Sequence, residues 1–302
     1  MTCRIIFLFI AMACTPSLLR AGEVEPRAYV NTPIGVNFML LGYAYSEGGL
    51  STEGGSPITD AELDTHTVIL AYAHSLEVMG KSAKVDVIVP YSDLSGSALF
   101  SGQPREREVD GLHDPRFRFS INLYGAPALS LQEFSHYQQD LIIGASLQVS
   151  PPLGQYNKNK LVNLGTNRWF IKPGIGISKA WGALTLELSE SVFLYTDKHD
   201  NFGNTTLEQD PLYATQAHLT YNIKPGIWAA VSGTIENGGR TQVDGVKNDD
   251  EQENTRLGIT LAASIDKNHS IKLYGNYALH TRVGTDYDLV GVAWQYRWGG
   301  GL

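Results

Sequence analysis

Hydrophobic and polar residues alternate along many short stretches of the chain, and residues 290–298 show this most plainly. One face of that stretch is apolar and aromatic from Val290 to Trp298, whereas Gln295 and Arg297 lie on the other face. A period of two residues is typical of a β-strand. Because aromatic side chains end the apolar face, we expect that face to meet the lipid and the interface of a membrane.

The same alternation predicts about twelve strands. They are expected near residues 33–46, 61–76, 83–91, 115–124, 139–150, 168–179, 183–195, 211–223, 227–236, 255–265, 270–281 and 287–298. An even number of antiparallel strands closes a barrel with both ends of the chain on the periplasmic side. The predicted fold is therefore all-β, a transmembrane antiparallel up-and-down β-barrel whose last strand pairs with the first near residues 35–42.

The lengths of the connections support a membrane barrel, because bacterial barrels have short periplasmic turns and longer outer loops. Short connections near 78–80, 180–182, 225–226 and 267–268 alternate with long ones near 47–59, 92–114, 151–167, 196–210 and 237–254. Two connections depart from this rule. Residues 282–286 are short for an outer loop, and residues 125–138 are long for a periplasmic turn. Within 125–138 the spacing of Leu129, Leu131 and Phe134 fits either a small amphipathic helix or an irregular turn.

The first 21 residues have the layout of a secretory signal peptide. Arg4 precedes an apolar run at 5–13, and Ala21 is a small residue at which cleavage can occur. The run is shorter than the roughly 20 residues that cross a bilayer as a helix. We therefore expect a signal peptide at residues 1–21 and one β-barrel domain at residues 22–302. A lipoprotein cut before Cys14 is the alternative for this end of the chain.

Alternation alone does not distinguish a lipid-facing wall from a protein core, so a secreted soluble β-sandwich or lipocalin-like barrel is the main structural alternative. About twelve strands exceed the roughly seven to nine of one sandwich, which favours the membrane barrel. The expected mature chain, without Arg4 and Arg20, is acidic, because the whole sequence has 23 Lys and Arg against 31 Asp and Glu. This balance indicates no nucleic-acid surface.

The face opposite the apolar one carries charged and polar residues in many predicted strands. They are Lys84, Asp86, Arg116, Arg118, Lys172, Glu187, His218, Lys272, His280 and Arg297. A charged side chain that faces lipid near the midplane costs about 2 to 4 kcal/mol, so we expect these residues to face the lumen. They form either an interior network that stabilises the barrel or a selectivity ring along a solute pathway. A barrel of about twelve strands has a narrow lumen.

Signals for catalysis or a cofactor are lacking in the sequence. No His-Glu-x-x-His zinc pair and no Gly-x-Ser-x-Gly elbow occur. Acidic stretches near 197–204 and 249–253 lack the ordered spacing of a calcium loop, so solvated acidic loops are the simpler interpretation. A barrel lipase is the rival function, and His74-Ser75 is its nearest hint, but adjacent residues of a strand point to opposite faces. We expect no enzymatic activity, no cofactor and no metal.

Several motifs resemble one family of outer-membrane proteins. They are Gly-Leu-His-Asp-Pro-Arg at 111–116, Pro-Leu-Gly-Gln-Tyr at 152–156, the stretch from Leu161 to Trp169, Gly-Gly-Arg-Thr at 238–241 with Asp244-Gly245, and the ending from Trp294 to Leu302. Together they resemble the outer-membrane transporter family named for the MetA-pathway of phenol degradation, over nearly the whole mature chain. The resemblance implies a transmembrane barrel that admits small organic compounds, aromatic ones included, and it assigns no catalytic residue.

We therefore expect an outer-membrane channel of a Gram-negative bacterium, reached by export to the periplasm, through which small organic solutes diffuse passively. The alternative is a closed structural or adhesion barrel without transport activity. The expected partners are outer-membrane lipid and lipopolysaccharide, the barrel assembly machinery during biogenesis, and the solutes themselves, but no nucleic acid. Outer-membrane barrels usually end on an aromatic residue, whereas Trp298 is followed here by Gly299-Gly300-Gly301-Leu302.

Overall fold

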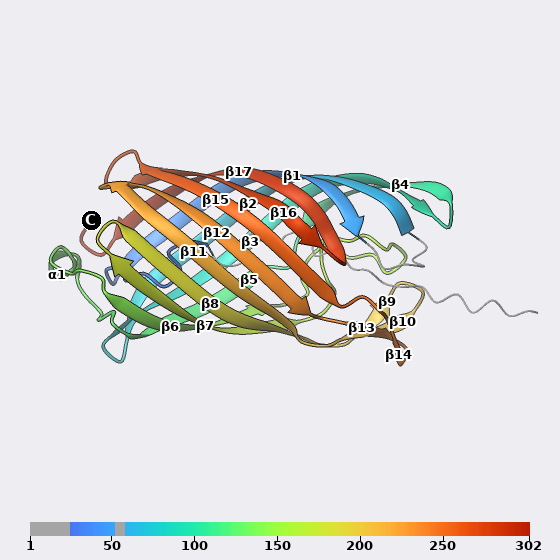
Figure 1. Cartoon of the computed structure of the whole chain (residues 1–302), viewed down its shortest axis with the longest axis horizontal. Helices are drawn as coiled ribbons and strands as arrows, with labels where there is room; N and C mark the ends of the chain where they lie inside the picture. The colour runs from blue at the N-terminus through green and yellow to red at the C-terminus, as the bar shows by residue number, and fades with distance from the viewer. Residues whose placement is uncertain (1–24, 52–57) are drawn as a thin grey trace, which may run out of the picture.

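The computed structural model describes residues 25–51 and 58–302, so the expected signal peptide at 1–21 lies outside the described residues. The main sheet is antiparallel and closes on itself, because its end strand β2 also pairs with β3 (Figure 1). β4 and β5 follow one another along the same edge of β3 and share one position around the barrel. The barrel therefore has twelve strand positions, as the sequence predicts.

The strands of the barrel are long and mostly joined in sequence order. They are β1 (Val36–Ser51), β2 (Ile58–Val78), β3 (Lys81–Phe100), β4 (Gln103–Leu112), β5 (Arg116–Tyr124), β6 (Leu141–Ser150), β7 (Phe170–Trp181), β8 (Leu184–Tyr195), β11 (Leu212–Lys224), β12 (Ile227–Gly238), β15 (Gln252–Ser264), β16 (His269–Thr281) and β17 (Gly284–Gly299). The predicted closing pair is confirmed, since β1 and β17 pair in one unbroken register from Val36 opposite Gly299 to Ser51 opposite Gly284.

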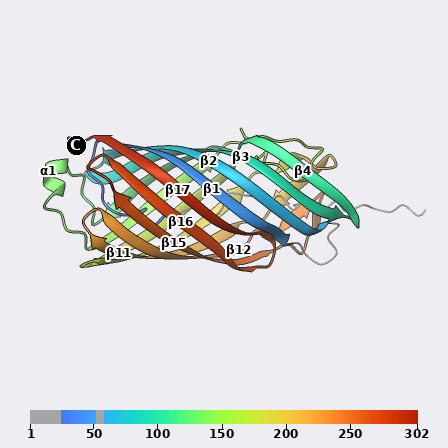
Figure 2. The same cartoon turned by 90° about the horizontal axis from the view of Figure 1, so that it is seen from above.

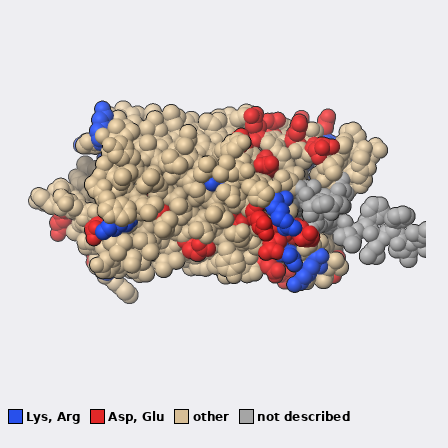
Figure 3. All heavy atoms as spheres, viewed as in Figure 1, with Lys and Arg blue, Asp and Glu red and all other residues tan. Residues whose placement is uncertain are grey.

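The outer wall is apolar where the strands would cross the membrane. Leu41, Leu70, Ile175, Leu219 and Ile259 are among the large hydrophobic side chains that remain exposed in the barrel. Figure 3 shows few Lys, Arg, Asp or Glu side chains along the middle of the visible wall, whereas many gather at one end. A continuous apolar band of this kind is what a lipid bilayer requires of a barrel. Among the described residues no helix is both long and apolar enough to span a bilayer.

Short turns gather at one end of the barrel, together with the C-terminus and the helix α1 (Leu131–Phe134) (Figure 2). This end is the periplasmic one, because short turns mark that side in bacterial barrels. The connection that contains α1 combines the two predicted alternatives. It is irregular apart from one helical turn, which Ser130 and Glu133 cap reciprocally.

The opposite end carries longer strands and a separate small sheet. That sheet contains β9 (Lys198–Asn201), β10 (Thr205–Gln209), β13 (Thr241–Val243) and β14 (Val246–Lys247). The prediction of an outer loop at 92–114 is wrong, because most of these residues form the hairpin of β3 and β4. This hairpin stands beyond the apolar band, so it lacks the lipid-facing alternation from which the membrane strands were predicted.

Residues 151–169, which connect β6 to β7, fold back into the outer end of the barrel. Leu164 packs in a buried cluster with Leu63, Leu94 and Val109. The carboxylate of Asp114 accepts a hydrogen bond from the Gly154 backbone N–H at 2.8 Å and one from that of Thr166 at 2.7 Å. The outer end of the lumen is therefore narrowed by this connection.

Candidate functional site

The lumen is the candidate functional site, and most of the predicted inward residues reach it. Lys84, Asp86, Arg116, Arg118, Lys172, Glu187, His218 and Lys272 lie on the inner face of β3, β5, β7, β8, β11 and β16, where they line cavities or contact chain that runs inside the barrel. The orientation of these eight residues follows from the two-residue period of their strands. Their role in solute passage is a separate question, which their contacts address.

The described chain begins inside the barrel, and residues 25–35, here called the inner segment, run along the lumen to the start of β1 at the periplasmic end. Two backbone N–H groups of this segment, those of Arg27 and Tyr29, donate to the buried carboxylate of Glu187. The Lys84 Nζ donates to the Ala28 carbonyl at 3.3 Å. Lys-to-carbonyl and carboxylate-to-amide bonds of this kind hold backbone rather than a particular side chain, so they fix the path of the segment.

Tyr29 is the best-packed side chain of the inner segment, with only 4% of its surface exposed. Its ring lies against two glycines that face each other on neighbouring strands, Gly144 of β6 and Gly176 of β7. A Cβ at Gly176 would come within 2.2 Å of the ring, and one at Gly144 within 2.5 Å. The two glycines therefore provide the space that the ring occupies, and the Tyr29 hydroxyl lies 3.3 Å from Ser146 Oγ.

The periplasmic part of the inner segment is also held by hydrogen bonds. The Asn31 Nδ2 donates to the Pro127 carbonyl at 3.1 Å, and the Ser75 Oγ donates to that of Pro33 at 2.6 Å. The backbone N–H of Ile34 donates to the Leu129 carbonyl at 2.9 Å. The segment is thus anchored along its length, and it obstructs the periplasmic half of the lumen.

Several of the predicted lumen charges are engaged with each other or with aromatic rings. Arg118 forms an ion pair with Asp86 at 2.9 Å. The Lys272 Nζ lies 2.5 Å from the Glu25 carboxylate of the inner segment. The Lys172 Nζ stands 4.5 Å from the centroid of the Phe193 ring. These contacts match the interior network that the sequence left open as one of two alternatives.

Two inward predictions need correction. Arg297 has the inward phase on β17, but its Nε donates to the Lys267 carbonyl at 2.6 Å, so its side chain binds the periplasmic turn. His280 pairs with Thr255 because a bulge between Thr255 and Arg256 shifts the register of β15 and β16. Thr255 points away from the lumen, because its neighbour Arg256 is buried and points inward. His280 shares the face of Thr255, so the His280 side chain is exposed on the outer side of the barrel.

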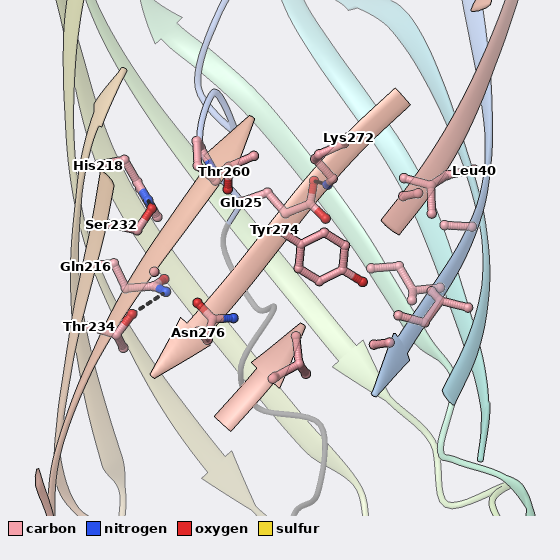
Figure 4. Close-up of a pocket in the computed structure, with 18 of the residues that line it drawn as sticks. Glu25, Leu40, Gln216, His218, Ser232, Thr234, Thr260, Lys272, Tyr274 and Asn276 are labelled. Atoms are coloured by element: carbon pink, nitrogen blue, oxygen red, sulfur yellow. Dashed lines mark hydrogen bonds and ion pairs between the residues drawn. The ribbon is translucent and has the colours of Figure 1, made fainter. Parts of the chain in front are cut away.

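A cavity of about 140 Å³ lies beside the inner end of the inner segment, where Glu25 and Pro26 contribute to its lining (Figure 4). One side of the cavity is mainly apolar and is lined by Leu40, Ala44, Ala71, Ile88, Leu289 and Ala293. The other side is polar and is lined by Gln216, His218, Ser232, Thr234, Thr260 and Asn276. Arg116 and Lys272 also reach the lining, so two of the predicted charges stand at this cavity.

The described loops at the outer end hold charged residues that bond to one another. Among the described residues, no three His, Cys, Asp or Glu side chains are grouped so as to hold an ion. The acidic stretch at 249–253 is used internally instead. Asp250 accepts hydrogen bonds from the backbone N–H of Thr241 at 2.7 Å and from the Thr241 hydroxyl at 2.5 Å. Glu251 pairs with Arg240 at 2.8 Å.

A buried lysine, Lys198 of β9, connects the small outer sheet to the connection 151–169. Its Nζ lies 4.9 Å from the centroid of the Tyr156 ring. Burial lowers the pKa of Lys198 to about 7, and the nearby Arg168 guanidinium lowers it as well, whereas Asp114 opposes the shift. This amine is therefore only partly charged near neutral pH.

The inner segment and the two glycines behind Tyr29 are functional features that sequence reasoning missed. Residues 25–35 carry no alternation, so the pattern that located the strands gives no sign of where they lie. Gly144 and Gly176 fall on the inward phase of two neighbouring predicted strands. Small residues on adjacent inner faces were the one signal that something packs there.

Comparison with known proteins places the chain in a family. A family model described as "Putative MetA-pathway of phenol degradation" matches residues 48–296. The chain belongs to this family. The resemblance seen in the sequence motifs is thereby confirmed. No curated protein matches the chain.

Solved structures share its fold. The COG4313 outer membrane channel from Pseudomonas putida F1 has a TM-score of 0.79 and 22% sequence identity, covering 91% of this chain and 100% of that one. The β domain of the Bordetella autotransporter BrkA has a TM-score of 0.51 at 11% identity, covering 88% and 100%. The translocator domain of the autotransporter NalP from Neisseria meningitidis also has 0.51, at 9% identity, covering 89% and 91%. This family member is therefore an outer-membrane β-barrel.

Proposed function

We propose that this family member is a passive outer-membrane channel for small organic solutes, aromatic ones included. The observation that carries the proposal is the lumen itself, which contains a cavity of about 140 Å³ between an apolar and a polar side. A barrel that served only as an anchor would gain stability from filling this space with side chains. The Pseudomonas putida protein with the TM-score of 0.79 is described as an outer membrane channel, which supports the same role here.

The proposed solutes are small, because the lumen is obstructed at both ends. The inner segment occupies the periplasmic half, and the connection 151–169 narrows the outer end. A solute that crosses must pass beside these elements or displace them. No energy-coupling element is evident in the described chain, so the driving force in this proposal is the gradient of the solute itself.

The second candidate is a closed structural or adhesion barrel, and the anchoring of the inner segment favours it. Glu187, Lys84 and Lys272 all contact this segment, so three of the predicted pathway charges stabilise an obstruction. The two candidates make opposite predictions for solute flux. They agree that the protein is not an enzyme.

Liposome swelling distinguishes them. The purified full-length barrel, refolded in detergent and reconstituted, should admit small uncharged solutes faster than protein-free liposomes do, with rates that fall as solute size increases. Swelling equal to that of protein-free liposomes, for a preparation whose barrel is folded by heat-dependent gel mobility, would show that the closed barrel is the correct candidate.

Delivery and membrane contacts complete the proposal. We infer that residues 1–21 direct export and are removed, that the barrel assembly machinery inserts the chain, and that lipopolysaccharide surrounds the outer end of the apolar band. Mass spectrometry of the mature N-terminus checks the first point. A mature chain that begins at Gly22 agrees with it, and a chain that retains Met1 contradicts it.

A further inference from the structure

The inner face of β16 carries two side chains that lie sideways against glycines of the neighbouring strands. Tyr274 pairs with Gly291 of β17, and Asn276 pairs with Gly258 of β15. A Cβ at Gly291 would come within 2.3 Å of the Tyr274 ring, and one at Gly258 within 2.4 Å of the Asn276 Oδ1. The two glycines therefore leave free the space that these side chains occupy.

The side chains of Tyr274 and Asn276 diverge, because β17 and β15 flank β16 on opposite sides. Both side chains line the lumen cavity of about 140 Å³ (Figure 4). Inward side chains fill the interior of the narrowest barrels. Here the tyrosine ring lies along the wall instead, so the cavity stays open beside it.

The ring of Tyr274 is held in this position by packing. On the outer side it packs against the buried cluster of Ala44, Tyr287 and Leu289. The Lys272 Nζ lies 5.4 Å from the ring centroid, and within the described part of the chain no hydrogen bond holds the Tyr274 hydroxyl. Because the cluster blocks movement towards the outer end, a displaced ring moves into the cavity.

We infer that Tyr274 determines the size of the solutes that pass through the cavity, and that Gly291 keeps its ring against the wall. The inference rests on the proposed channel function and makes it more specific. A side chain at residue 291 would meet the far end of the Tyr274 side chain rather than backbone, so the ring yields and narrows the cavity. Small solutes then still pass, whereas larger ones are excluded.

Liposome swelling with glycerol, arabinose and glucose, which increase in size, tests the inference on the purified full-length barrel. Gly291→Ala should slow the entry of glucose several-fold and that of glycerol much less. Tyr274→Ala alone should raise the flux only slightly, because the inner segment lies in series with the cavity. The double variant is decisive, since Gly291→Ala should have no effect once Tyr274→Ala has removed the ring.

Tyr274→Trp gives a second measurement that leaves both glycines unchanged, so it serves even if Gly291→Ala does not fold. Its larger ring should also slow glucose several-fold, whereas Tyr274→Phe should behave as wild type because the ring and not the hydroxyl limits size. Gly275→Ala is the matched control. Gly275 follows Tyr274 on β16 but has the outward phase, and its Cβ meets nothing closer than 3.4 Å.

The outcomes separate the role of Tyr274 from the channel proposal. Wild-type rates for all three solutes in folded Gly291→Ala or Tyr274→Trp would overturn the inference and leave the channel proposal intact. A loss that persists in the double variant would also overturn it, because that loss comes from the backbone and not from the ring. A wild-type barrel that admits none of the solutes rejects the channel proposal, and the size role of Tyr274 with it.

Discussion

The lumen contains two regions that are built in different ways. Around the inner segment, charged side chains such as Glu187, Lys84 and Lys272 contact the protein's own chain. Around the cavity, Gln216 and His218 carry polar groups that the rest of the described protein leaves partly unpaired. The charged region therefore holds an obstruction in place, whereas the region around the cavity keeps open space in the lumen.

This difference changes how lumen charges are interpreted in a narrow barrel. A row of inward Lys, Arg, Asp and Glu has the composition of a selectivity filter, yet most of the row serves packing here. Arg118 pairs with Asp86 inside the barrel, and the Lys272 ammonium pairs with Glu25. In such a barrel, inward charges alone therefore do not identify a solute pathway.

The largest expected effect comes from removing the space that Tyr29 occupies. Gly176→Ala places a Cβ about 2.2 Å from the Tyr29 ring, so the inner segment must move. We expect a several-fold rise in single-channel conductance, with the barrel still folded. Gly233→Ala in β12 is the control, because its Cβ meets nothing within 4 Å. An unchanged conductance in folded Gly176→Ala would show that the segment does not limit the pathway.

A smaller effect is expected from Glu187→Ala, which removes the acceptor of two backbone hydrogen bonds of the inner segment. Hydrogen bonds to a charged group contribute about 1.5 to 3 kcal/mol each, but the Tyr29 packing remains. Current recordings should show more frequent open periods than in wild type, and Glu187→Gln should restore part of the closed time. Glu190→Ala is the control, because Glu190 lies on the same strand but is exposed on the outer side and accepts a hydrogen bond from Thr215. It should behave as wild type. Open periods as frequent as those of Glu187→Ala would contradict a role of Glu187 in holding the inner segment.

The smallest effect concerns pH at the outer end. The pKa of Lys198 is about 7 in the closed arrangement, in which the connection 151–169 packs against the amine. It is near 10.4 in an open arrangement, in which this connection has moved away and the amine is exposed. The open arrangement therefore binds more protons between these values, so the closed arrangement gains stability as pH rises from 7 towards 10 and loses it as pH falls to 7. Proteolysis of the connection 151–169 should be slower at pH 9 than at pH 7. Lys198→Met should remove this difference, and a difference of the same size in the variant would refute the assignment to Lys198.

The fold could be predicted from the sequence because each membrane strand has one face in lipid. Alternation such as that from Val290 to Trp298 predicts both the strand and its orientation, and eight of the ten residues predicted to face the lumen do face inward. Arg297 departs from the expectation because a long side chain at a strand end can turn back to a nearby backbone carbonyl, here that of Lys267.

The obstruction could not be predicted in the same way. The inner segment is held by contacts to strands far away in sequence, such as that of Tyr29 with Glu187, and it has no periodicity of its own. The hairpin of β3 and β4 was missed for a related reason, since strands beyond the bilayer lack a lipid-facing side. The unpaired atoms of Gln216 and His218 depend on which neighbours are already bonded, which composition and spacing do not contain.

Single-channel recording of two matched proteins tests the central claim most directly. One is the wild-type barrel, and the other carries residues 25–33 replaced by a Gly-Ser stretch of equal length, which keeps the chain but removes Tyr29 and the other side chains of the inner segment. The account predicts a small conductance for the wild type and a several-fold larger one for the replacement. Equal conductances, or no conductance in either folded protein, would contradict a solute channel limited by its own inner segment.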